Sequence, residues 1–452
     1  MPSYGLVLKT FTHIIKNMPM PAKLKEIFHS FDPAVRGDRK TIGQLAQKYF
    51  EENQKKLKEN PASQRPTGLC FDPGSFSKNG NLSIVFEGGG MKGYVHLGAF
   101  MALLEEGLIP KDCHLSFYGT SAGSIAAIAC SLISSGKMSV KEVYDKFTFH
   151  PVYLIFFVNP VPIYNLFNGR LIRWRVDGVL KKKGIKTLSE LRVAVTSVVY
   201  DVQKKQSYLA VFGPKPFSDV HLEKVDPWRF GKGLTVGKAV QSSSAMPGLF
   251  TAGVISNARI TVLKPRAPYE SRVPYGKRIL AEPGTPGVIE EHELKGIGLL
   301  TDGGTKANLP TIVALSTPRY RKEADLVYAI NIEVEKKETS LREFLEKLRY
   351  ANPKTRFVRF LKNILDASIQ SLYLLHIRNN IVSTMKRTID SMMEEIAERG
   401  NALCMHGNII RLDIHAPDVS LWRPDKAGKL VLEGYLQTKK QIKELKKLAG
   451  II

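Results

Sequence analysis

The chain has 452 residues, of which 43% are hydrophobic and 24% are charged. This composition allows a sizeable buried core and indicates a globular protein, which excludes a disordered chain. Lysine and arginine number 66 against 42 aspartate and glutamate residues, so the formal net charge is +24. An excess of this size predicts an anionic partner, for which nucleic acid and acidic membrane are both candidates.

Cysteine usage and hydrophobic runs indicate the compartment. The four cysteines lack metal-ligand spacing, which indicates a reducing environment; they are Cys70, Cys113, Cys130 and Cys404. Lys9 interrupts the short apolar stretch within residues 1–20, so we expect no secretory signal there. No run of about 18 apolar residues occurs, so we expect no transmembrane helix. We therefore expect a cytoplasmic protein, or one secreted without a cleavable signal peptide, that is peripheral on membranes.

Residues 1–80 differ in composition from the rest of the chain. They are rich in Lys, Glu, Gln, Asn and Pro, with helix-like stretches at 6–17 and 42–57. A segment rich in proline and glycine, residues 60–81, closes this section. We expect a helical N-terminal extension over residues 1–80 and one larger domain over residues 81–452.

From Leu82 onward, short apolar strands alternate with helices. The pattern predicts strands at 82–87 and 115–118 and helices at 93–106 and 122–135. Such alternation is typical of βαβ units and predicts an α/β fold with a mainly parallel sheet. Later strands are predicted at 193–199, 207–212, 326–332 and 409–415, and later helices at 339–350, 355–398 and 437–448. Five prolines within residues 259–298 predict a long surface insertion.

The pentapeptide Gly119-Thr120-Ser121-Ala122-Gly123 follows a predicted strand and precedes a predicted helix. This is the layout of a nucleophile elbow, in which a sharp turn presents a serine hydroxyl and the flanking glycines avoid steric collisions. A simple glycine-bounded turn with a solvated serine is the alternative. The pattern makes Ser121 a candidate nucleophile for acyl transfer.

A second glycine cluster, Gly88-Gly89-Gly90-Met91-Lys92-Gly93, also lies between a strand and a helix. Its spacing satisfies G-x-G-x-x-G, but the next strand ends without the Asp or Glu that a dinucleotide site needs. A P-loop is excluded because Lys92 is not followed by Ser or Thr. We expect this loop beside the elbow, with the N–H groups of Gly88, Gly89 and Gly90 forming an oxyanion hole.

A third cluster, Asp302-Gly303-Gly304, again follows an apolar stretch. It makes Asp302 the candidate base, although Asp-Gly is also a common turn dipeptide. A Ser-Asp-His triad is the competing arrangement, for which the candidate histidines are His376, His406 and His415.

Together the three clusters resemble the patatin-like phospholipases. That family has a Gly-Gly-Gly-x-Lys/Arg-Gly loop, a Gly-x-Ser-x-Gly elbow and a later Asp-Gly-Gly or Asp-Gly-Ala. Residues Gly88–Gly93, Gly119–Gly123 and Asp302–Gly304 match these motifs in order and spacing. The likeness covers about residues 82 to 448, and further matches lie in Ser242–Phe250, in Asn308 and Pro310, and in Leu432–Thr438, which resembles the family's closing helix.

The resemblance implies a three-layer patatin-like α/β fold with a mainly parallel central sheet flanked by helices. It also implies a Ser121/Asp302 dyad that works without histidine, metal or cofactor and cleaves acyl esters of lipids as a phospholipase A1/A2 or lysophospholipase. By the same resemblance the residues that support the catalytic loops are Lys92, Gly93, Gly119, Gly123, Gly303 and Gly304. The chain departs from the family pattern at Glu87, where many relatives carry Asp, and in its long 259–298 insertion.

Two further features bear on the substrate. The aromatic stretch 152–167 is either core or a wall for an acyl chain beside the elbow. Basic residues crowd 342–362 and 439–447, which predicts a membrane surface with anionic lipids as partner. No nucleic-acid-binding motif accompanies the charge, so we expect no nucleic acid.

Two alternatives to a lipid hydrolase are a non-catalytic membrane-binding protein of the same fold and a Ser-His-Asp esterase. Some bacterial relatives act inside host cells with a host protein, so the resemblance also raises an effector role and an activating protein partner.

Overall fold

The computed structural model describes residues 69–70, 81–109, 113–148, 165–222, 234–265, 287–317, 326–334, 409–416 and 426–448. The helix-like stretches at 6–17 and 42–57 lie outside the described residues, as do the helices expected at 339–350 and 355–398. The same is true of the basic stretch 342–362 and of the aromatic stretch 152–167 up to residue 164.

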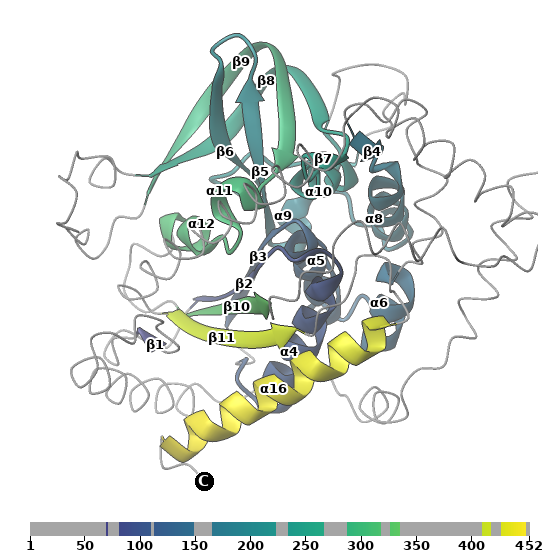
Figure 1. Cartoon of the computed structure of the whole chain (residues 1–452), viewed down its shortest axis with the longest axis vertical. Coiled ribbons are helices and arrows are strands. Elements are labelled where there is room, and N and C mark those ends of the chain that lie inside the picture. The colour runs from purple at the N-terminus through teal and green to yellow at the C-terminus, as the bar shows by residue number, and fades with distance from the viewer. Residues whose placement is uncertain are drawn as a thin grey trace, which may run out of the picture.

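Within the described residues, nine strands form one sheet in the order β1-β11-β10-β2-β3-β5-β6-β8-β9 (Figure 1). The strands are β1 (Leu69–Cys70), β2 (Asn81–Phe86), β3 (His114–Thr120), β5 (Val193–Asp201), β6 (Gln206–Phe212), β8 (Gly253–Pro265), β9 (Gly287–Asp302), β10 (Leu326–Val334) and β11 (Ile409–Ala416). A separate pair joins β4 (Asn165–Phe167) to β7 (Gly248–Phe250).

The middle of the sheet is parallel, over β11, β10, β2, β3 and β5. These strands are almost continuously buried, as expected for strands that are covered on both faces. Helix α4 (Tyr94–Glu105) follows β2 and helix α5 (Ala122–Ser134) follows β3. The prediction of an α/β fold with a mainly parallel central sheet is confirmed.

The other side of the sheet is antiparallel. Strand β9 pairs with β8 along most of its length, and its last residues pair with β5. The residues at 259–265 and 287–298, which we expected in a long surface insertion, belong to paired strands. The prolines that prompted the expectation, apart from Pro265 at the end of β8, fall within 266–286, outside the described residues.

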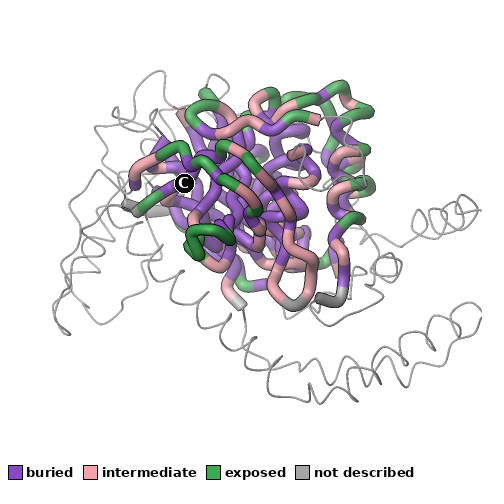
Figure 2. The backbone as a smooth tube through the Cα atoms, turned by 90° about the horizontal axis from the view of Figure 1, so that it is seen from above, coloured by how far each residue is buried: buried purple, intermediate pink, exposed green. Residues whose placement is uncertain are grey.

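Helices cover both faces of the sheet. Successive strand residues point to opposite faces. Phe86 and Phe117 accordingly pack in one hydrophobic cluster with α4 and α5. Val85 and Tyr118 pack in another, which includes residues of α11 (Gly304–Ala307) and α12 (Thr311–Ser316). Figure 2 shows the buried residues gathered inside the described part of the chain, with exposed residues around them.

The α4 face is extended by several further helices, namely α6 (Val140–Phe147), α8 (Arg170–Lys182), α9 (Leu188–Leu191), α10 (Val236–Ser243) and α16 (Ala427–Leu448). Helix α16 crosses α4 closely, because a Cβ at Gly98 would lie 1.9 Å from Val431 O and one at Gly434 would lie 2.1 Å from Val95 O. We expected this last helix to begin at residue 437, but it begins at Ala427. Among the described residues, no helix is both long and apolar enough to span a membrane.

Candidate active site

Ser121 lies on the sharp turn between β3 and α5. Its backbone dihedrals are φ 53° and ψ −123°, which residues with a side chain rarely adopt. The flanking glycines leave room for this turn. A Cβ at Gly119 would lie 2.2 Å from Gly123 O, and a Cβ at Gly123 would lie 2.3 Å from Phe86 O. The local geometry is that of a nucleophile elbow.

The register of the sheet brings Asp302 to this turn. Thr120, the last residue of β3, pairs with Thr196 of β5. The next residue of β5, Ser197, pairs with Asp302 at the end of β9. Ser121 and Asp302 therefore lie on either side of the same point of β5, although they are far apart in sequence.

The hydroxyl of Ser121 lies close enough to Asp302 to lower the pKa of its carboxyl by acting as a donor toward it. The backbone N–H of Gly304 donates a hydrogen bond to the carboxylate, at 2.7 Å from Oδ1. Burial outweighs both effects and raises the pKa of Asp302 from 3.8 to about 7. A carboxylate with a pKa near neutrality is well suited to accept a proton and return it.

Ser243, the last residue of α10, forms hydrogen bonds with the backbone of the Ser121 turn and of the Asp302 loop. Its hydroxyl accepts a hydrogen bond from Ser121 N at 2.8 Å and donates one to Thr196 O at 2.5 Å. Its carbonyl oxygen accepts from Gly303 N at 3.4 Å. The serine-rich segment that resembles the family thus connects the elbow to the Asp302 loop.

The glycine loop after β2 lies directly against the nucleophile. A Cβ on Gly88 would be 3.2 Å from the Cβ of Ser121. Gly90 has φ 56°, a left-handed conformation that favours glycine. Gly93 packs against the elbow, since a Cβ there would lie 2.7 Å from the Cβ of Ala122. The expectation that the two loops are neighbours is therefore met in the structure.

One part of the oxyanion-hole expectation needs correction. The N–H of Gly88 donates to Asn308 O at 3.0 Å, so it is already used and is not available to a developing oxyanion. The N–H groups of Gly89 and Gly90 have no acceptor among the described residues. They remain as the candidate oxyanion donors, and Lys92 lies in the 3-10 helix η1 (Gly90–Gly93) that follows.

The carboxyl of Glu87, the residue before the glycine loop, accepts hydrogen bonds from two distant segments of the chain. Its Oε1 accepts from Asn308 Nδ2 at 2.6 Å and its Oε2 accepts from Ile332 N at 2.5 Å. Burial raises the pKa of Glu87 to about 7, against the lowering effect of these bonds and of the positive charge of Arg411. Because Asn308 also accepts from Gly88 N, Glu87 and Asn308 together clamp the glycine loop to the loop that follows Asp302.

His96 supports the same loop from α4. Its Nε2 is 2.8 Å from Glu87 O, and burial lowers the pKa of the ring to about 4. The imidazole is therefore neutral at pH 7, with Nε2–H as donor. His96 holds the main chain at Glu87.

The candidate triad histidines do not accompany the dyad in the described residues. His376 and His406 lie outside the described residues. His415 lies on β11, where its Nδ1 pairs with Glu333 at 2.9 Å. In the described part of the chain, the Asp302 carboxylate accepts a hydrogen bond from the Gly304 N–H, and the Ser121 hydroxyl lowers its pKa.

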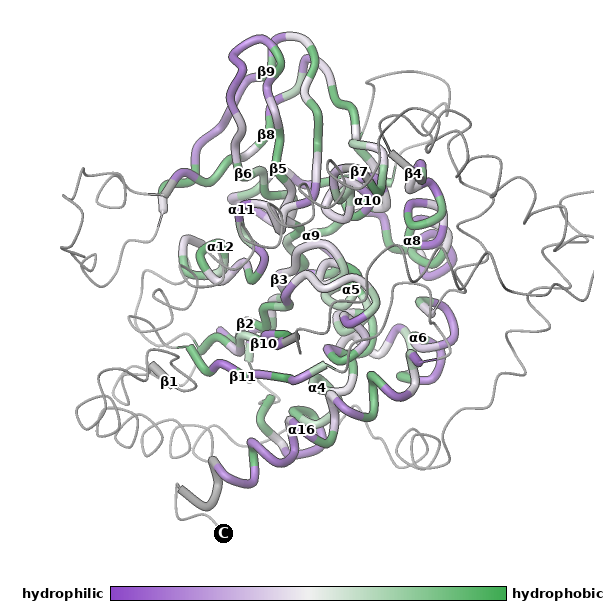
Figure 3. The backbone as a smooth tube through the Cα atoms, viewed as in Figure 1, coloured by the Kyte–Doolittle hydropathy of each residue, from purple (hydrophilic) through white to green (hydrophobic). Residues whose placement is uncertain are grey.

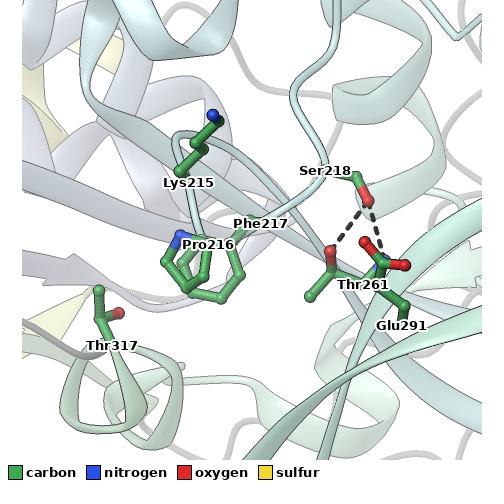
Figure 4. Close-up of a pocket in the computed structure, with 7 residues that line it drawn as sticks. All are labelled: Lys215, Pro216, Phe217, Ser218, Thr261, Glu291 and Thr317. Atoms are coloured by element: carbon green, nitrogen blue, oxygen red, sulfur yellow. Dashed lines mark hydrogen bonds between the residues drawn. The ribbon is translucent and has the colours of Figure 1, made fainter.

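A cavity of about 560 Å³ lies elsewhere in the molecule. Figure 4 shows its lining, in which Ser218 is hydrogen-bonded to Thr261. The lining residues are Lys215, Pro216, Phe217, Ser218, Thr261, Glu291 and Thr317. Neither Ser121 nor Asp302 is among them, so this cavity is separate from the dyad.

The model of the patatin-like phospholipase family matches residues 84–315, which is about half of the chain and includes all three glycine-rich clusters. The chain belongs to the patatin-like phospholipase family. No curated protein matches this patatin-like chain. The crystal structure of VipD from Legionella pneumophila is similar with a TM-score of 0.36 and 14% sequence identity, over 82% of this chain and 68% of VipD.

Membership of the patatin-like family supports a lipid hydrolase function. Sequence reasoning had placed Ser121, Asp302 and the glycine loop together, but it gave no role to Ser243, His96 or the carboxyl of Glu87. The only sequence signals were the Ser242–Phe250 likeness to the family and the substitution of Glu for Asp before the glycines.

Proposed function

We propose that this protein is a phospholipase A-type hydrolase that cleaves fatty-acyl esters of anionic membrane phospholipids with a Ser121/Asp302 dyad. The observation that supports this most is the position of Ser121, on a strained elbow, beside the buried carboxyl of Asp302, whose pKa the serine hydroxyl lowers. Family membership supplies the reaction class, and the net charge of +24 favours an anionic surface.

In the proposed reaction, Ser121 Oγ attacks the ester carbonyl carbon while its proton passes to Asp302. The carbonyl oxygen becomes an oxyanion, which the N–H groups of Gly89 and Gly90 stabilise. Asp302 then returns the proton to the leaving lipid alcohol as the carbon–oxygen bond breaks. A water molecule, activated by Asp302, attacks the acyl-serine, and the fatty acid is released with Ser121 reprotonated.

The raised pKa of Asp302 suits both halves of this cycle. At pH 7 an acid with a pKa of about 7 is present in comparable amounts as base and acid. An ordinary surface aspartate would be almost wholly ionised and would return a proton reluctantly.

The test is release of fatty acid from vesicles of phosphatidylcholine with phosphatidylserine. Lipids with different chains at the two glycerol positions report which ester is cleaved. The matched control is Ser135→Ala, which removes a hydroxyl just beyond the opposite end of α5. We expect Ser121→Ala and Asp302→Asn to lose at least about 10³-fold in rate, while Ser135→Ala remains active.

The assay is run with and without a eukaryotic cell extract, since we also propose a protein activator. Equal rates for the wild type and Ser121→Ala under both conditions would contradict the hydrolase and favour a non-catalytic membrane-binding protein. Activity that survives Asp302→Asn would contradict the dyad and favour a different base.

A further inference from the structure

The antiparallel part of the sheet extends past the dyad. Strand β5 reaches the level of the elbow at Thr196, the register partner of Thr120, and continues to Asp201. Strands β5, β6, β8 and β9 form a closed four-stranded unit, because each pairs with the next and β9 pairs with β5. Figure 1 shows β8 and β9 rising beyond α10 and α11. We call residues 200–205 and 295–297 at this end the sheet tip.

Hydrogen bonds fix the main chain of the sheet tip. The carboxylate of Asp201 accepts from Gln203 N at 3.0 Å and from Lys204 N at 3.1 Å, which closes the turn between β5 and β6. Val202 N donates to Ile297 O at 3.2 Å, which joins this turn to β9. The side chains of the sheet tip are therefore presented from a defined backbone.

Three apolar side chains of the sheet tip are exposed to solvent. Tyr200 is 38% exposed, Val202 is 42% exposed and Ile297 is 52% exposed. Val202 lies opposite Ile297 in the antiparallel pairing, and Tyr200 lies two residues before Val202, so all three project from the same face. None of them belongs to the two hydrophobic clusters of the core. Single exposed apolar residues are ordinary, but three neighbours on a fixed backbone indicate a contact surface.

Two half-buried residues enlarge this apolar face. Leu299 of β9 pairs with Tyr200 on one side and with Val254 of β8 on the other. Paired residues of neighbouring strands point to the same face of a sheet. Leu299 and Val254 also belong to neither hydrophobic cluster. The apolar face therefore spans three strands.

The exposed charges of the sheet tip are positive. They belong to Lys204, Lys205 and Lys295. Lys205 and Lys295 have no ion pair among the described residues. The acid of the sheet tip, Asp201, is buried and pairs with His292 at 3.1 Å. The next acid along β9, Glu293, is exposed and lies across from Arg259 of β8. Figure 3 shows both hydrophobic and hydrophilic residues at this end of the sheet.

The sheet tip and the dyad lie at the same edge of the sheet. Strands β2 and β3 end at the glycine loop and at the elbow, and β5 runs parallel to β3 past this level. At about 3.3 Å per residue, the sheet tip stands on the order of 15 Å beyond the elbow. A flat surface that meets the sheet tip therefore faces the edge that contains Ser121 and Asp302.

We propose that the sheet tip docks on an anionic phospholipid bilayer, with Tyr200, Val202 and Ile297 inserted at the interface and Lys205 and Lys295 on the lipid headgroups. Tyrosine suits the boundary between water and acyl chains, and each lysine beside it adds attraction to anionic lipid. This inference rests on the proposed function and deepens it, since it names the surface that would bring the dyad to its substrate.

The experiment measures binding without turnover, in the full chain with Ser121→Ala, by co-sedimentation with vesicles of phosphatidylcholine alone or with phosphatidylserine. We expect binding to the anionic vesicles that weakens with salt. Ile297→Ser should weaken it roughly 10-fold, because an apolar side chain no longer enters the bilayer. Lys205→Gln/Lys295→Gln should weaken it roughly 25-fold. Ile297→Trp should add tryptophan emission that brominated acyl chains quench.

Helix α16 supplies matched controls. Leu436→Ser removes an apolar side chain that is 38% exposed, and Lys440→Gln/Lys443→Gln removes two exposed lysines and changes the net charge equally. We expect both variants to bind within about threefold of the parent. Leu436→Trp should add emission that brominated lipid does not quench.

Equal losses in the sheet-tip and α16 variants would overturn the sheet tip as the docking surface, as would added emission from Ile297→Trp that lipid leaves unchanged. Absence of binding to either kind of vesicle would overturn it too and would favour a protein partner on this face. Because no turnover is measured, these results would leave the proposed hydrolase activity standing, and an inactive wild type would not affect the binding result.

Discussion

The hydroxyl oxygen of Ser243 lies 2.8 Å from the backbone nitrogen of Ser121 and accepts its hydrogen bond. Ser121 has a positive φ of 53°, which costs on the order of 1 to 3 kcal/mol in a residue with a side chain. A fixed acceptor for its N–H helps to hold that conformation. Because the same hydroxyl also donates to Thr196 O, Ser243 ties the elbow to β5, next to Asp302.

We therefore predict that Ser243→Ala lowers kcat by roughly 10- to 100-fold with little change in KM. The variant leaves Ser121 N and Thr196 O without their partner, which costs about 1 to 3 kcal/mol in the free energy of unfolding. Both effects are measured with a lipid ester assay and denaturant unfolding. Ser243 is a positioning residue in this account.

The matched control is the preceding residue. Ser242 is buried on the same helix, and its hydroxyl has no hydrogen-bond partner among the described residues. Ser242→Ala removes the same atom without breaking a bond, so both kcat and stability should stay near the wild-type values. Equal losses in the two variants would show that Ser243 contributes only packing.

The rate should depend on pH through Asp302. Its carboxyl must be ionised to accept the proton of Ser121, and burial raises its pKa to about 7. We predict that kcat/KM on a lipid ester rises with pH, roughly tenfold per unit at low pH, and levels off above about 7. Glu87 has a pKa in the same range, so the profile is repeated with Glu87→Gln. If the midpoint of the rise in kcat/KM moves to about pH 4 in Glu87→Gln, the ionisation of Glu87 and not that of Asp302 controls the rate.

The same pKa values predict how stability changes with pH. Burial raises the pKa of Asp302 from 3.8 and that of Glu87 from 4.5, each to about 7. At these two carboxyls the folded protein therefore holds more protons than the unfolded chain, and their contribution to the free energy of unfolding falls as pH rises from about 4 to about 7. His96, whose pKa burial lowers from 6.5 to about 4, opposes this fall up to about pH 6.5. Asp302→Asn should remove one carboxyl's share of the fall, measured by denaturant unfolding at several pH values. A variant with the same pH dependence as the wild type would contradict the raised pKa of Asp302.

The sequence was sufficient to predict that the glycine loop meets the elbow, because the ends of neighbouring parallel strands share an edge of the sheet. Asp302 ends the antiparallel strand β9, so its place beside Ser121 was expected only from the family resemblance. The elbow, the glycine loop and Asp302 are all features of short sequence segments. The assignment of Gly88 as an oxyanion donor was wrong because its N–H partner, Asn308 O, comes from a distant segment. Ser243 was missed for the same reason, since a serine within a serine-rich stretch does not indicate which backbone group it will meet.

Glu87 and Asn308 form a second test of how the glycine loop is held. Glu87→Ala would leave Ile332 N and Asn308 Nδ2 without acceptors, at an expected cost of about 2 to 5 kcal/mol in unfolding free energy. We predict a fall in kcat as well, since Gly89 and Gly90 directly follow this clamp. Glu87→Gln should recover more than half of the lost stability, because its Oε1 can still accept from Ile332 N and its Nε2 can meet Asn308 Oδ1, which has no partner among the described residues. Equal free energies of unfolding for Glu87→Ala and Glu87→Gln would show that the hydrogen bonds of Glu87 do not stabilise the glycine loop.

Gly123 tests whether the elbow and the glycine loop must touch. A Cβ at this position would lie 2.3 Å from Phe86 O and 2.7 Å from Glu87 O, so neither backbone can remain in place. We predict that Gly123→Ala lowers the free energy of unfolding by at least about 3 kcal/mol and abolishes fatty-acid release.

Gly178→Ala is the matched control, because it adds the same methyl group to a helix where nothing lies within 4 Å. It should raise stability by about 0.5 to 1 kcal/mol through helix propensity alone. A Gly123→Ala protein as stable as Gly178→Ala would mean that the two loops can separate, and the oxyanion donors would then have to be sought elsewhere.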